Sequence, residues 1–160
     1  MTTSTTTARR GRRLLATGSI LALGLSLTAC GASDFLKKQT ADAWSVTYEV
    51  TVEGKDINRL TEVSYLDAPS RGESSSNVPV GEAVTTNSAS NAAKASWTKD
   101  VMVTAEADAR ISATPGNGAK ATCRILLDGE RELAKQTGAP GKPVECSVTT
   151  PAFETKKKSR

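Results

Sequence analysis

The sequence contains no histidine, only three cysteines and few aromatic residues. The missing histidine excludes Ser-His-Asp and Cys-His catalytic arrangements, and it removes a main ligand of ordinary zinc sites. Aromatic side chains make up 4% of the chain. A nucleic-acid-binding domain would need a basic stripe with interleaved aromatics, and the sequence has none. We therefore expect no nucleic-acid partner, no metal and no cofactor.

Acidic residues are absent from Met1 to Cys30, where four arginines precede the apolar run 14–27. As a helix this run of 14 residues would span about 21 Å, whereas a bilayer core of about 30 Å requires roughly 20 apolar residues. A basic segment followed by a short apolar run is the layout of an export signal. We therefore expect residues 1–29 to be a cleaved signal peptide.

The apolar run closes with L-T-A-C at residues 27–30. This stretch resembles the lipobox of bacterial lipoproteins, in which small residues before the cysteine admit a signal peptidase. The resemblance implies that Cys30 carries the lipid and becomes the mature N-terminus, anchored at the extracytoplasmic face of the cell membrane. The alternative is a short signal anchor in which Cys30 is incidental. Arg12-Arg13 loosely resembles a twin-arginine signal, and the export route stays open.

The net charge of +4 is concentrated at the two ends of the chain. Between Cys30 and Glu154 there are 13 basic and 17 acidic side chains, a net charge of −4. We expect residues 30–43 to form a tether and residues 151–160 a basic disordered tail. Contact of this tail with anionic lipid or wall polymer is the alternative.

Two cysteines, Cys123 and Cys146, remain if Cys30 is acylated. An exported protein meets oxidising conditions, so we expect these two to form a structural disulfide. A metal-binding or nucleophilic role is the alternative.

Residues 44–52 (W-S-V-T-Y-E-V-T-V) alternate strictly between apolar or aromatic and polar side chains, which predicts a half-buried strand. Further strands are expected at 60–66, at 78–84 and at 97–107, where apolar residues alternate from 101 onward. Pro79 and Gly81 favour an edge position for the strand at 78–84. Residues 85–94 are expected to form a mobile loop and residues 112–118 a turn.

The last third of the chain predicts a hairpin and a final strand. Alternate residues at 121–127 are apolar, and Asp128-Gly129 then supplies the positive φ angles of a type I′ turn. Residues 143–148 place Cys146 on an apolar face. Together these patterns predict an all-β sandwich of about seven short strands over residues 44–150.

Several of these segments resemble the MmpS family, the small mycobacterial membrane proteins and their actinobacterial transport-accessory relatives. The resemblance spans residues 46–148 and rests on V-T-Y-E-V, E-V-S-Y-L-D, Trp97 before a valine strand, and C-R-I-L-L-D-G-E followed by V-E-C. It implies an immunoglobulin-like sandwich and a partner that is a large RND-type exporter of lipids or siderophores, similar to MmpL.

These observations favour a non-catalytic accessory lipoprotein that docks an exporter. A stand-alone lipoprotein that binds a small ligand or a wall component is the alternative. An enzyme is a third hypothesis, but no spacing selects a carboxylate pair among five candidate aspartates, Asp42, Asp56, Asp67, Asp108 and Asp128. We expect Trp44, Tyr48 and Tyr65 in the core, whereas Trp97 is either a core plug or a partner-docking residue.

Overall fold

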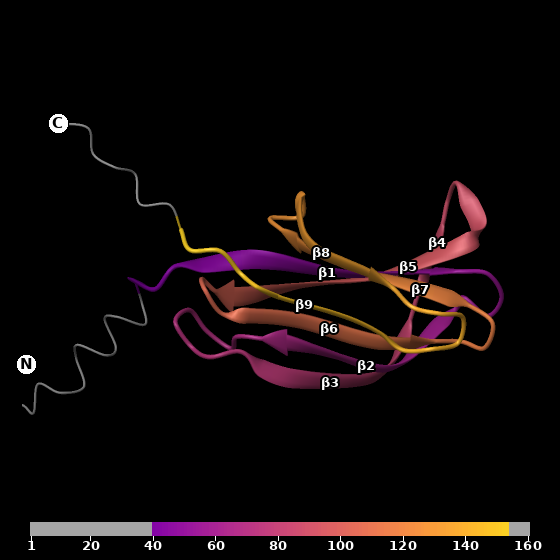
Figure 1. Cartoon of the computed structure of the whole chain (residues 1–160), viewed down its shortest axis with the longest axis horizontal. Coiled ribbons are helices and arrows are strands. Elements are labelled where there is room, and N and C mark those ends of the chain that lie inside the picture. The colour runs from indigo at the N-terminus through magenta and orange to yellow at the C-terminus, as the bar shows by residue number, and fades with distance from the viewer. Residues whose placement is uncertain (1–39, 154–160) are drawn as a thin grey trace, which may run out of the picture.

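The computed structural model describes residues 40–153, which form two antiparallel sheets packed face to face (Figure 1). One sheet has the strand order β4-β5-β1-β7-β8 and the other has β3-β2-β6-β9. The strands of this part of the chain are β1 (Ala43–Glu53), β2 (Arg59–Asp67), β3 (Ser76–Val84), β4 (Thr86–Ser88), β5 (Asn91–Thr104), β6 (Asp108–Pro115), β7 (Lys120–Leu127), β8 (Arg131–Thr137) and β9 (Val144–Thr149). The predicted all-β sandwich is confirmed, with nine strands in these residues instead of about seven.

Strand β1 is the centre of the larger sheet, because it pairs with β5 on one side and β7 on the other. Its inward side chains alternate with outward ones, as the sequence predicts, and the inward set is fully buried: Val46, Tyr48, Val50 and Val52. β-branched and aromatic side chains suit this position because they pack well on a pleated surface. The core therefore lies between β1 and the facing β2 and β6.

The strand order follows the immunoglobulin pattern except at one edge of the larger sheet, where β8 is also added. If β1 to β6 are taken as strands B, C, C′, D, E and F, then D-E-B and C′-C-F lie in separate sheets, as in immunoglobulin domains. The place beside B, which strand A takes in those domains, is occupied here by β7. Strand β9 lies beside β6, where strand G is found.

Residues 85–94 are not the expected loop. Thr86–Ser88 forms β4, and it pairs with the start of β5 across a turn at residues 89–90. Small polar side chains give no alternating pattern, but they fit an exposed edge hairpin whose stability comes from backbone hydrogen bonds. The mobile-loop prediction is therefore wrong.

Strand β6 was also not expected. The strand predicted through residue 107 ends at Thr104, where Glu106 takes a positive φ of 61° and Ala107 N–H donates to the Thr104 carbonyl. Residues 112–115, predicted as part of a turn, belong to β6, and the turn follows at residues 116–118. The inward residues of β6 include Ala109 and Ala113, and alanine signals a buried strand only weakly.

The predicted turn between β7 and β8 is confirmed. Asp128 and Gly129 have φ angles of 51° and 73°, and Glu130 N–H donates to the Leu127 carbonyl at 3.0 Å. Positive φ at both central residues defines a type I′ turn. The first ladder pair beyond it is Leu127 with Arg131.

Candidate functional site

Cys30, the predicted lipidation site, lies outside the described residues, as do the predicted signal peptide and most of the tether. Within residues 40–153, no helix is long and apolar enough to cross a membrane. The chain enters the sandwich at Ala43. Figure 1 shows that β1 begins and β9 ends at the same end of the molecule, which we call the near end.

At the near end, an aromatic contact joins the start of β1 to the segment that follows β9. The Trp44 ring stacks on Phe153 with centroids 3.9 Å apart, and its Nε1–H donates to the Pro151 carbonyl at 2.8 Å. The guanidinium of Arg131 lies 5.9 Å from the Trp44 ring centroid, within cation–π range. Trp44 is therefore partly buried and lies at the periphery of the core. Through these contacts residues 151–153 pack on the domain.

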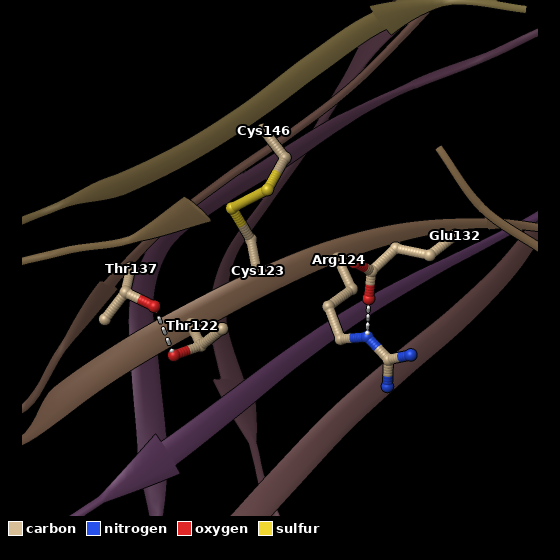
Figure 2. Close-up of a disulfide and its surroundings, with 6 residues drawn as sticks. All are labelled: Thr122, Cys123, Arg124, Glu132, Thr137 and Cys146. Atoms are coloured by element: carbon tan, nitrogen blue, oxygen red, sulfur yellow. Dashed lines mark hydrogen bonds and ion pairs between the residues drawn. A yellow bond between two sulfur atoms is a disulfide. The ribbon is translucent and has the colours of Figure 1, made fainter. Parts of the chain in front are cut away.

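The disulfide between Cys123 and Cys146 is confirmed, with Cα atoms 5.9 Å apart. It joins β7 of one sheet to β9 of the other, and both cysteines are buried. Figure 2 shows the bridge on one side of β7, while Thr122 and Arg124 extend from the other side toward β8 partners. One lateral side of the sandwich is therefore closed by a covalent bond.

The opposite lateral side is closed by an aromatic row of Tyr48, Tyr65 and Trp97. Their ring centroids are 5.8 Å apart for the first pair and 6.2 Å for the second. Tyr48 is fully buried and Tyr65 nearly so, as expected from the sequence. Trp97 pairs with Val50 and packs against the core, but it remains partly exposed at the rim.

The Tyr48 hydroxyl, at the buried end of this row, makes two hydrogen bonds to backbone groups. It donates to the Leu66 carbonyl of β2 at 2.8 Å and accepts from the Arg110 N–H of β6 at 3.2 Å. It thus bridges the two strands where their ladder ends at Tyr65 and Ile111. Burial raises the pKa of this phenol well above its ordinary value, although the hydrogen bond from Arg110 acts in the opposite direction. The phenol therefore stays protonated and serves as a structural link.

Among the described residues, no strand pairs with the outer edge of β5 over residues 97–101, beside Trp97. Before this segment β5 pairs with β4, and after it Met102 N–H donates to the Asp67 carboxylate and the Met102 carbonyl accepts from Ala68 N–H. The backbone groups of Met102 point away from β1, so by strand alternation those of Thr98 and Asp100 do too. We call residues 97–101 the open β5 edge.

The five aspartates considered for catalysis do not form one site. Asp56 lies between β1 and β2, at the end of the sandwich opposite the near end, whereas the other four lie at the near end: Asp42, Asp67, Asp108 and Asp128. Among residues 40–153, no three His, Cys, Asp or Glu side chains gather as a potential metal site. Sequence patterns identify Trp97 as a candidate docking residue. They do not indicate the open β5 edge, because that edge depends on where β4 ends.

The chain matches no model of a known protein family and no curated protein.

Proposed function

We propose that this protein is a non-catalytic lipoprotein, anchored through Cys30 at the extracytoplasmic face of the cell membrane, that serves as an accessory to an RND-type exporter similar to MmpL. The anchor is supported by the L-T-A-C stretch after a short apolar run. The exporter is supported by the sequence resemblance to the MmpS family.

One structural observation carries the docking role. The open β5 edge presents the outward backbone groups of Thr98 and Asp100 directly beside the partly exposed Trp97. An extended segment of a partner can add to such an edge through main-chain hydrogen bonds, while a neighbouring side chain gives specificity. Two of the other edges are less suited. Strand β3 contains Pro79 and irregular pairing with β2, and β8 carries alternating charges.

The test is a crosslinked pull-down of the full chain from native membranes. We expect a large multispanning transporter to be captured with the wild-type chain and lost with Thr98→Pro, because proline removes an outward N–H that the domain itself does not use. Lys135→Pro is the matched control, since the ladder alternation of β8 also points its N–H outward, at the other edge of the sheet. Trp97→Ala should weaken capture as well.

Equal capture by wild type and Thr98→Pro would contradict docking through this edge. Capture of no transporter, together with a small ligand or wall component that copurifies with the chain, would instead support the stand-alone lipoprotein. Cys30→Ala tests the anchor separately. We expect this variant to lose incorporation of labelled fatty acid and to leave the membrane, whereas unchanged labelling would refute lipidation.

A further inference from the structure

A polar hollow of about 230 Å³ lies at the end of the sandwich opposite the near end, which we call the far end. Three connections meet there: residues 54–58, 116–119 and 138–143. The hollow is smaller than the roughly 300–1,000 Å³ of sites for drug-sized ligands. Its size therefore suits one small unit, such as a single sugar or polyol.

Three polar side chains in the lining are suited to bind a ligand. Within residues 40–153, Arg59 has no ion pair, so its guanidinium is available to an incoming anion. Asp56 offers a carboxylate that accepts hydrogen bonds, and Asn117 offers an amide that both donates and accepts. The hydroxyl of Thr114, also in the lining, is already engaged with the Glu62 carboxylate at 2.8 Å.

The walls of the hollow are held in a fixed arrangement. Asp56 takes a left-handed φ of 56°, which is uncommon for a residue with a side chain. Its carboxylate lies so close to Gly116 that a Cβ added there would come within 2.5 Å of it. The Gly141 N–H donates to the Ala119 carbonyl at 2.8 Å, which ties the third connection to the second. Aspartate tolerates this conformation in tight connections, so these contacts fix the course of residues 54–58 around the hollow.

The charge around the hollow is mixed, with a slight excess of basic side chains, because Asp56 and Glu62 also lie there. Lys55, Lys120 and Lys142 are exposed at the far end together with Arg59. The acidic Glu53 is paired with Lys94 at 2.6 Å, and this hydrogen bond lowers the pKa of the Glu53 carboxyl.

Over the residues that the structure describes, the near end is acidic. It carries Arg71, Arg110 and Arg131 against a larger acidic set: Asp42, Asp67, Glu73, Glu106, Asp108, Asp128 and Glu130. Among these described residues, the field therefore favours an anionic ligand at the far end over the near end.

We propose that the far-end hollow binds the phosphate ester of a sugar or polyol unit. Arg59 would hold the phosphate through its planar fork of N–H donors, the geometry that makes arginine a common phosphate ligand. Asp56 and Asn117 would bind the hydroxyl groups of the unit. This site is separate from the open β5 edge and does not depend on the exporter.

The test uses the full chain in uncharged detergent micelles, with amide chemical shifts as the readout. We expect glucose 1-phosphate and glycerol 3-phosphate to shift the amides of residues 116–118 and 141. Arg59→Gln should weaken binding at least fivefold. Arg131→Gln, an exposed arginine at the near end, is the matched control and should leave the affinity unchanged.

A second variant separates phosphate recognition from hydroxyl recognition. Asp56→Asn should weaken the binding of glucose 1-phosphate more than that of inorganic phosphate, whereas Arg59→Gln should weaken the binding of both.

Tighter binding of poly(glycerol phosphate) than of glycerol 3-phosphate, still dependent on Arg59, would identify a polymer as the source of the unit. Binding of equal affinity would identify the free ester. Absence of shifts at the far end, shifts confined to residues 154–160, or equal loss in Arg131→Gln would overturn the proposal.

Discussion

At the scale of single residues, the Tyr48 hydroxyl makes the most consequential polar contact of the core. It links β2 and β6 just beyond the end of their ladder, and both of its partners are backbone groups. Sequence alternation was enough to place this side chain in the core. It could not reveal the hydroxyl's partners, which lie 18 and 62 residues away.

Tyr48→Phe should lower the free energy of unfolding by about 1–3 kcal/mol, because it leaves the Leu66 carbonyl and the Arg110 N–H, both in partly buried surroundings, without their partner. Denaturant unfolding measures the loss. Tyr65→Phe is the matched control, since the Tyr65 hydroxyl makes no hydrogen bond within residues 40–153 and its removal should cost less than half as much. Equal losses in the two variants would refute the bridging role.

The raised pKa of Tyr48 also predicts a dependence of stability on pH. The native state holds its proton above pH 10, where an unfolded tyrosine releases it. The unfolded state then binds fewer protons, so stability is fully present below about pH 10 and falls as the pH rises further, by at most about 1.4 kcal/mol per pH unit. Unfolding of wild type and Tyr48→Phe between pH 8 and 12 should show a steeper decline in wild type. Parallel declines would contradict the assignment.

At the scale of elements, the sequence predicts strands well where apolar and polar residues alternate strictly, so that the two faces of the strand differ in polarity. Strand β1 and the β7–β8 hairpin were expected because valine, isoleucine and an Asp-Gly pair give unambiguous signals. Strand β6 was missed because Ala109 and Ala113 are small and Pro115 resembles the start of a turn. Strand β4 was missed because its three residues are polar on both faces.

Gly129→Val should destabilise the domain by about 1 kcal/mol or more. Position 129 has a φ of 73°, a conformation that a β-branched residue adopts only with strain, although open space surrounds the position. Thermal unfolding checks this. Gly129→Asn is the control, because asparagine tolerates the left-handed region, and it should retain most of the wild-type stability. A valine variant as stable as wild type would show that the turn can take another form.

At the scale of the whole molecule, the strand order and the far-end hollow lay beyond the reach of sequence patterns. The walls of the hollow come from Asp56, Asn117 and Gly141, three points that only the folded sandwich brings together. The disulfide was predictable because, once Cys30 is set aside, two cysteines have a single possible pairing. Its position was not, since it joins the strands in the A and G places and not those in the B and F places used by antibody domains.

Reduction of the Cys123–Cys146 bond should lower the free energy of unfolding by about 3 kcal/mol in the chain-entropy account of a loop closed over a separation of 23 residues. Thermal unfolding with and without reductant measures the loss, and mass spectrometry confirms the state of the thiols. The Cys123→Ala/Cys146→Ala variant, which is insensitive to reductant, is the control. An unchanged melting temperature together with lost partner capture would show that the bridge serves function and not stability.

The position of β1 has a mechanical consequence. The segment that leads to the predicted anchor joins the domain at Ala43, and β1 runs from there toward the far end between two neighbours. If the predicted anchor holds Ala43 while a partner bound at the open β5 edge pulls on the domain, the force enters along β1. It is then shared at once by 11 residue pairs with β5 and eight with β7. Such a shear load does not separate the pairs one at a time, so the two-sided pairing of β1 would let the domain carry tension from the predicted anchor without unravelling.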